Sequence, residues 1–162
     1  MSHRPFLRWP DKRLRTPAGP VGAVTDAHRA VWDEMVEAMR AMPGVGLAAP
    51  QIGVMLRLAV VDDGTGVTRL ADPEVVAASA RMREHEEASP NLPGVSAVVS
   101  RPRAVTVAYT DETGARREEE FVLLRATSVQ HQIDHLDGRM FFHRLSRLKR
   151  DRLLKRAAKL AA

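Results

Sequence analysis

The chain has 162 residues, of which 44% are hydrophobic and 28% charged, a composition typical of one globular domain spanning residues 1–162. It contains no cysteine, which excludes disulfide frameworks and thiolate metal clusters, and its formal net charge is +5. No segment reaches the roughly 18 uninterrupted apolar residues of a membrane span, and arginines and prolines interrupt the first ten residues, unlike a signal peptide. We therefore expect a cytoplasmic protein with no membrane partner.

The hydrophobic pattern predicts helices and strands in mixed order along the chain. A helix is predicted over residues 26–42, with Thr25 or Asp26 as its N-cap. Strands are predicted over residues 55–61, 95–100, 104–109 and 116–123, the last two joined by a turn. A helix over residues 124–136 follows, and a basic helix comes last. This order predicts an α+β fold with mainly antiparallel sheets around a central helix.

The predicted central helix carries two histidines, His131 and His135, four positions apart. Residues at this spacing share one helix face, a geometry that holds a zinc-like ion in the H-E-x-x-H arrangement. In the H-E-x-x-H arrangement, the residue after the first histidine is a glutamate that transfers protons. Here it is Gln132, whose amide matches glutamate in size but cannot accept and return a proton near neutral pH. The metal-binding spacing is therefore present without its proton carrier.

Three segments together resemble the peptide deformylase family, whose motifs read roughly G-x-G-x-A-A-x-Q, E-G-C-L-S and H-E-x-x-H in this order. Residues 44–51, GVGLAAPQ, match the first motif in full, and residues 131–135, HQIDH, correspond to the third. Counting back from Pro93-Gly94 places residues 87–91, EASPN, at the second motif. The resemblance covers almost the whole chain and implies the fold of that family, with altered second and third motifs.

The resemblance also implies a metal-dependent reaction. The family removes the formyl group from the N-terminal formyl-methionine of new chains, with iron, zinc or nickel held by one thiolate and two imidazoles. His131 and His135 match the imidazoles, but Ser89 takes the place of the cysteine. A serine hydroxyl stays protonated at neutral pH and is a poorer ligand than a thiolate. We expect weak or absent binding of a divalent metal.

The family's substrate contacts are partly retained in this chain. Gly46 and Gln51 match a loop in which glycine allows close backbone approach and the glutamine amide donates to the formyl oxygen. Pro90 stands where a leucine offers its backbone N–H, which proline lacks. Loss of a general acid/base costs ~10²–10⁴ in rate, and loss of one oxyanion donor about 10²–10³. Conventional deformylase activity is therefore predicted to be absent or very weak.

A substitute for the missing thiolate could come from the residues just before Ser89. His85, Glu86 or Glu87 would supply an imidazole or a carboxylate as the third ligand. We interpret Glu87 instead as a structural residue paired with Arg101. Moving Glu87 to a metal would leave that arginine without its partner.

Positive charge gathers at the C-terminus, at Arg144, Arg147, Lys149, Arg150, Arg152, Lys155, Arg156 and Lys159. In the family a basic C-terminal helix can dock on the ribosome near the exit of nascent chains, so the resemblance implies RNA contact. The alternative is a solvated helix face with no nucleic-acid partner. In that case four leucines pack the helix on the body: Leu145, Leu148, Leu153 and Leu154.

Two functions are consistent with the sequence. The first is a pseudoenzyme of the deformylase type, which recognises N-formylated peptide N-termini or the ribosome without catalysis. The second is a divergent metal-dependent amide hydrolase on the same fold, with a new third ligand and another proton carrier. The first predicts little bound metal and no turnover, whereas the second predicts stoichiometric metal and hydrolysis. We favour the first because the sequence offers no replacement for the base.

Overall fold

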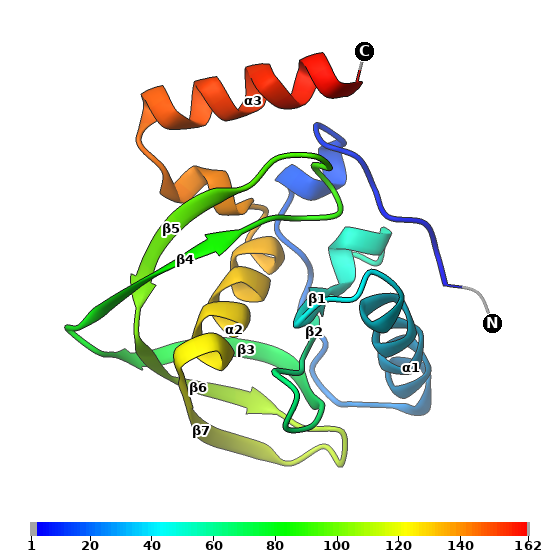
Figure 1. The fold of residues 1–162 in the computed structure, drawn as a ribbon. Coiled ribbons are helices and arrows are strands. Elements are labelled where there is room, and N and C mark those ends of the chain that lie inside the picture. Colours follow the sequence, from blue (N-terminus) through cyan, green and yellow to red (C-terminus); the bar gives the residue numbers. More distant parts are fainter. Residues whose placement is uncertain (1–2, 162) are drawn as a thin grey trace.

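The structure, a computed structural model, describes residues 3–161 and contains two antiparallel sheets (Figure 1). The larger sheet has five strands in the order β1 (Gly46–Ala48), β2 (Leu58–Val61), β3 (Thr68–Ala78), β6 (Ala104–Thr110) and β7 (Arg116–Val122). The smaller sheet pairs β4 (Met82–Glu87) with β5 (Ala97–Pro102). All pairings between these strands are antiparallel, which confirms the predicted α+β fold.

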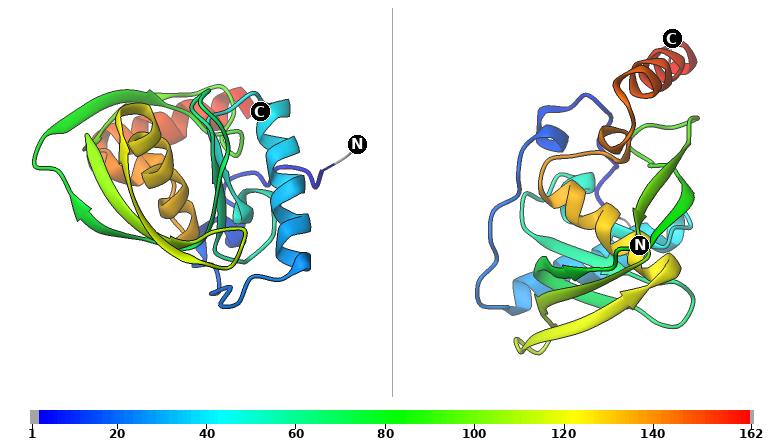
Figure 2. Two further views of the ribbon diagram at one scale, coloured as in Figure 1. Left: turned by 90° about the horizontal axis from the view of Figure 1, so that it is seen from below. Right: turned by 90° about the vertical axis from the view of Figure 1, so that its left-hand side faces the viewer.

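Helix α2 (Leu123–Leu136) is the central element, and Figure 2 shows strands on both sides of it. Its apolar face packs against the five-stranded sheet, where Val129 and Ile133 share one core with Val107 and Phe121. Because most of α2 is buried, the side chains that it directs toward the two-stranded sheet are held by packing on several sides.

Helix α1 (Asp26–Ala41) covers the opposite face of β1 and β2, where Trp32, Met35 and Met39 pack against Leu47 and Leu58. The short strand β1 therefore lies between two helices, and all three of its residues are buried. This position fixes the segment that runs from β1 into the 3-10 helix η2 (Ala49–Ile52) and carries Gln51.

The chain ends in helix α3 (Arg147–Ala161), which follows the 3-10 helix η3 (Phe141–Arg144); another 3-10 helix, η1 (Lys12–Arg15), lies near the N-terminus. Leu153 of α3 is buried and Leu154 is partly buried. Leu148 is 61% exposed, so the prediction that it packs on the body is wrong. Leu148 precedes Leu153 by five residues, which places it about 140° around a helix of 3.6 residues per turn.

Three strands escaped prediction, each for a local reason. Strand β1 has only three residues, too few for a recognisable alternation. Strand β3 contains Pro73 next to Asp72, whose φ is +48°, and its register with β6 shifts at this point. Strand β4 reads Met-Arg-Glu-His-Glu-Glu and has no apolar face. The predicted strands over residues 55–61 and 95–100 also begin later, at Leu58 and Ala97, and the helix predicted over residues 26–42 ends at Ala41.

Candidate functional site

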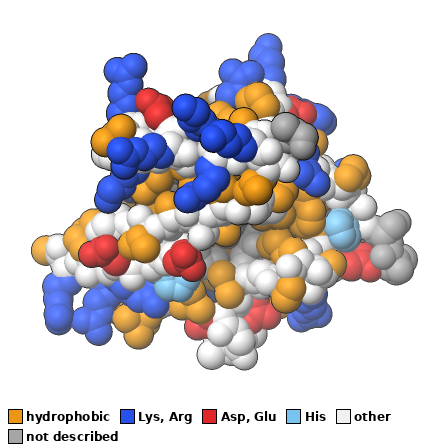
Figure 3. All heavy atoms as spheres, turned by 45° about the horizontal axis from the view of Figure 1, so that its top comes forward, with side chains coloured by type: hydrophobic (Ala, Val, Ile, Leu, Met, Phe, Trp, Pro, Cys, Tyr) orange, Lys and Arg blue, Asp and Glu red, His pale blue; other side chains and the backbone are white. Residues whose placement is uncertain are grey.

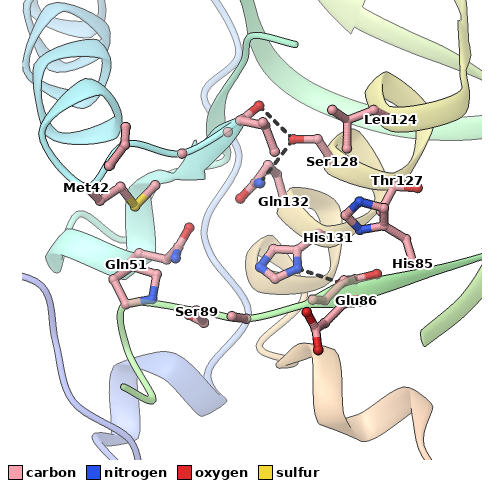
Figure 4. Close-up of a pocket in the computed structure, with 17 residues that line it drawn as sticks. Met42, Gln51, His85, Glu86, Ser89, Leu124, Thr127, Ser128, His131 and Gln132 are labelled. Carbon is pink, nitrogen blue, oxygen red and sulfur yellow. Dashed lines mark hydrogen bonds and ion pairs between the residues drawn. The ribbon is translucent and has the colours of Figure 1, made fainter. Parts of the chain in front are cut away.

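A cavity of about 380 Å³ lies between α2, the end of β4 and the segment around β1 (Figure 4). Six of the seven predicted site residues line it: Gly46, Gln51, Ser89, Pro90, His131 and Gln132. The seventh, His135, is 1% exposed, and its ring centroid lies 4.9 Å from that of His131. The structure thus brings residues from three distant segments to one place.

A buried carboxylate fixes the orientation of His131. The Nδ1 atom of His131 lies 2.8 Å from Oε1 of Glu87, whose carboxylate also accepts from Nε and Nη2 of Arg101 at 2.7 and 2.9 Å. Burial opposes ionisation of Glu87, but the bonds from His131 and Arg101 outweigh it and lower the pKa of Glu87 to about 2. An ionised carboxylate only accepts, so Nδ1 of His131 carries a proton and donates it to Glu87. The pairing of Glu87 with Arg101 is as predicted.

The same network ties α2 to the C-terminal part of the chain. Nη1 of Arg101 donates to Oδ2 of Asp134 at 2.8 Å. The Nε and Nη2 atoms of Arg144 donate to the same carboxylate, both at 2.8 Å. Because Arg144 is committed to Asp134, it contributes less to a free basic surface than its position in the predicted basic segment suggests.

His135 is a buried imidazole without a protein partner. Neither ring nitrogen has a hydrogen-bond partner among the described residues 3–161. Burial, aided by the neighbouring His131, lowers the pKa of His135 well below its ordinary value, so the ring is neutral. A buried unsatisfied N–H costs about 1–3 kcal/mol. A neutral imidazole with free nitrogens is chemically suited to bind a metal.

Ser89, at the position of the family's third metal ligand, does not fit the role of a metal ligand. The Oγ atom of Ser89 donates to Oδ1 of Asn91 at 3.1 Å and accepts from the backbone N–H of Asn91 at 3.2 Å. Within residues 3–161 no three His, Asp or Glu side chains are grouped so as to hold a metal ion. Glu87 is already bound to His131 and Arg101, so it is not a free substitute. The donor set is therefore two imidazoles and an engaged neutral hydroxyl, and it does not fit a three-ligand divalent site.

Asn91, which the sequence reasoning did not single out, organises the polar side of the cavity. It accepts from Nε2 of Gln51 at 2.8 Å and donates from its own Nδ2 to the backbone oxygens of Leu7 and Gln51 at 2.7 and 3.0 Å. Oε1 of Gln51 accepts from the N–H of Ala48 at 2.9 Å. The Gln51 amide is thus held in place, with one N–H left for a ligand. The place of Asn91 in the second motif was the available signal.

Ser128 is a second residue that the sequence reasoning missed. Its hydroxyl donates to the backbone oxygen of Val45 at 2.9 Å and accepts from Nε2 of Gln132 at 3.4 Å. A Cβ on Gly46 would collide with the Ser128 hydroxyl and the Gln132 amide, which explains why glycine stands there. Ser128 lies four residues before Gln132, on the same helix face, and this spacing was the feature of the sequence that could have identified it.

Basic side chains gather over α3 on one face of the molecule (Figure 3). Six of them are exposed: Arg147, Lys149, Arg152, Lys155, Arg156 and Lys159. Among the described residues, no helix has the length and apolar character needed to cross a membrane.

Residues 3–151 match the family model described as polypeptide deformylase. The chain is 43% identical to a peptide deformylase-like protein of Bradyrhizobium diazoefficiens, with 99% of this chain and 96% of the relative covered. It is also 43% identical to a peptide deformylase of Methylocella silvestris, with 99% and 86% covered.

Solved structures agree with these sequence matches. A peptide deformylase from Legionella pneumophila superposes with a TM-score of 0.90 at 37% identity, covering 99% of this chain and 96% of that one. The enzyme from Ehrlichia chaffeensis in complex with actinonin gives 0.91 at 32% identity, with 98% of each chain covered. The chain therefore belongs to the peptide deformylase family.

Proposed function

We propose that this chain binds peptide N-termini, including formylated ones, and hydrolyses the formyl amide very slowly or not at all. The family acts on nascent formylated peptides, and the cavity keeps the segment that carries Gly46 and Gln51. The observation that carries the proposal is the hydrogen bonding of Ser89, whose hydroxyl is engaged with Asn91 where the family has a thiolate.

Three chemical requirements of the family reaction lack a residue to meet them. Metal activation of water needs a firmly held ion. Ser89 is uncharged, and its hydroxyl oxygen is a poorer metal ligand than a thiolate. Proton transfer needs an acid or base at position 132, and the Gln132 amide is neither. Stabilisation of the developing oxyanion needs two donors, and Pro90 has no N–H. Such losses are not additive, but each lowers the rate.

The test is hydrolysis of formyl-Met-Ala-Ser by the full chain, assayed without oxygen after incubation with iron, nickel or zinc. Binding of the same peptide is measured in parallel by calorimetry. The proposal requires binding with turnover that is very slow or absent. Absence of binding, or turnover of order 10 per second as in an ordinary enzyme, contradicts it.

A second candidate is a divergent metal-dependent amide hydrolase. The unpaired nitrogens favour it, since Nδ1 of His85 and both nitrogens of His135 are buried without a partner in residues 3–161. His85 lines the cavity and would be the proton carrier in such an enzyme. Stoichiometric metal that resists a chelator, together with loss of hydrolysis in His85→Phe, is the pattern that this candidate requires.

The ribosome is a proposed partner through α3, in the cytoplasm where nascent chains emerge. The exposed lysines and arginines of that helix support contact with RNA phosphates. Co-sedimentation with ribosomes should weaken in Lys155→Glu/Lys159→Glu and with rising salt. Co-sedimentation that neither change affects would exclude this surface.

A further inference from the structure

A cavity of about 250 Å³ lies where the chain between α2 and α3 packs against β5 (Figure 1). Residues from β5, from α2 and from the segment after α2 line it: Ser100, Asp134, Arg139, Met140, His143 and Arg144. It shares no lining residue with the cavity that contains Gly46 and Gln51. A ligand of this second cavity is therefore separate from the peptide of the proposed function.

The ring of His143 brings one N–H donor to this cavity. The backbone N–H of Met140 donates to Nδ1 of His143 at 2.9 Å, so Nδ1 holds a lone pair and no proton. The ring proton is therefore on Nε2, which makes no hydrogen bond within residues 3–161. Burial and the nearby cation of Arg150 lower the pKa of His143, in agreement with a neutral ring. Nε2 of His143 is thus a donor of fixed direction that lacks an acceptor.

Two arginines add further donors to the same cavity. Arg144 donates to Asp134 through Nε and Nη2, which fixes its guanidinium plane and leaves the N–H groups of Nη1 for a ligand. Arg139 is exposed, and within residues 3–161 its side chain makes no ion pair. The lining therefore combines one held guanidinium with one that has no protein partner.

Positive charge exceeds negative charge around the cavity. Asp134 is the one carboxylate that the lining contains, and it already accepts from Arg101 and Arg144 at 2.8 Å each. Arg101 also pairs with Glu87, so two arginines balance two carboxylates in this network. The charge of Arg139 is left over. An anion in the cavity would therefore meet an uncompensated cation together with fixed N–H donors.

We propose that this cavity binds a phosphate group. A phosphate group is anionic and has several strong acceptor oxygens, so separate oxygens accept from His143, Arg139 and Arg144 at once. Guanidinium groups match the spacing of phosphate oxygens, which makes arginine well suited to this role. Both free phosphate and the RNA backbone carry this group, and the experiment below distinguishes these two sources.

The test is isothermal titration calorimetry of the full chain with inorganic phosphate at neutral pH, with the ionic strength held constant by sodium chloride. We expect saturable binding with a dissociation constant of about 1 mM, as for a small ligand held by a few contacts. The proton–nitrogen NMR signal of Nε2 of His143 should shift as phosphate binds. A signal that does not move during the titration contradicts the assigned site.

Two variants each remove one donor. Arg139→Gln removes an exposed guanidinium, so it should leave folding intact, and His143→Asn keeps an acceptor for the Met140 N–H but loses the second ring nitrogen. Each should weaken phosphate binding at least about fivefold, since hydrogen bonds to charged groups are roughly twice as strong as neutral ones. Arg81→Gln is the matched control, because Arg81 is exposed and does not line the cavity. Its affinity should stay within about twofold of that of the unmodified chain.

A short single-stranded oligouridylate distinguishes the two sources. If Arg139→Gln weakens binding of both the oligouridylate and inorganic phosphate, the site accepts RNA backbone phosphates. If it weakens inorganic phosphate alone, the site is selective for free phosphate, and both results support the proposal. Absence of saturable binding up to about 20 mM phosphate overturns it. Equal weakening in Arg81→Gln and Arg139→Gln also overturns it, because the attraction would then come from the net charge of the chain. These results do not depend on peptide binding in the other cavity.

Discussion

Glu87 joins His131 to Arg101: its carboxylate lies 2.8 Å from Nδ1 of the histidine and accepts two bonds from the arginine. The histidine is therefore oriented by a buried ion network that needs no metal. Arg101 also donates to Asp134, so the arginine that pairs with Glu87 is tied to helix α2 as well. This network explains how His131 keeps its orientation beside altered catalytic residues.

Removal of the central carboxylate should destabilise the fold strongly. Among residues 3–161, Glu87→Ala leaves the buried Arg101 with Asp134 as its one anionic partner, and breaking a buried pair in this way costs about 3–5 kcal/mol. Urea unfolding followed by circular dichroism measures the loss. The neighbouring exposed residue gives the control, since Glu86→Ala should change stability by no more than about 0.5 kcal/mol. Equal effects of the two changes would refute the structural role of Glu87.

The same carboxylate predicts an acid-sensitive stability. The pKa of Glu87 is about 2 in the folded chain against 4.5 ordinarily, so its contribution is complete above about pH 4.5 and is lost as the pH falls toward 2. Glu87→Gln has no such titration. The difference in unfolding free energy between the unmodified chain and this variant should therefore shrink between pH 5 and pH 2. A difference that stays constant over this range contradicts the assignment.

Gly46 should tolerate no side chain. A Cβ there would lie within van der Waals overlap of the Ser128 hydroxyl and the Gln132 amide, so Gly46→Ala should cost about 1–3 kcal/mol. Removing the hydroxyl in Gly46→Ala/Ser128→Ala should recover part of this loss. Gly19→Ala is the control, because its Cβ would meet only the Met55 backbone oxygen at 3.6 Å. Thermal unfolding of these proteins, together with the single variant Ser128→Ala, decides, and an additive double variant would exclude the collision.

Returning the thiolate should restore metal binding before it restores catalysis. In Ser89→Cys the zinc affinity should rise by more than about 100-fold, since changes even to outer-shell partners shift affinity 10–100-fold. Ser96→Cys is the control. It places a thiol on the same segment, but the Ser96 hydroxyl that the thiol replaces contacts Glu86 and not the histidine pair. Competition with a chromophoric chelator measures both. Similar zinc affinities in the two variants would show that position 89 does not face the histidine pair.

Much of the fold and of the candidate site followed from the sequence, and the missing parts have physical causes. The helix with His131 and His135 was predictable because its spacing and its flanking motif agree. Strand β4 was not, because a charged strand gives no apolar alternation. The roles of Asn91 and Ser128 are hydrogen bonds between segments, and local sequence does not specify such bonds.

The central claim is that the substitutions at Ser89, Gln132 and Pro90 disable this site. Measuring whether reversing them restores hydrolysis tests this claim most directly. Gln132→Glu alone should leave formyl-Met-Ala-Ser unhydrolysed, because without a firmly bound metal there is no activated water for the base to act on. The Ser128 hydroxyl would also have to stop donating to the Val45 backbone oxygen before it could donate to the new carboxylate. Ser89→Cys/Gln132→Glu should give the first clear activity, and Pro90→Leu should add about 10²-fold. Efficient hydrolysis by Gln132→Glu alone would contradict the account, because the metal site would then be intact with Ser89 in place.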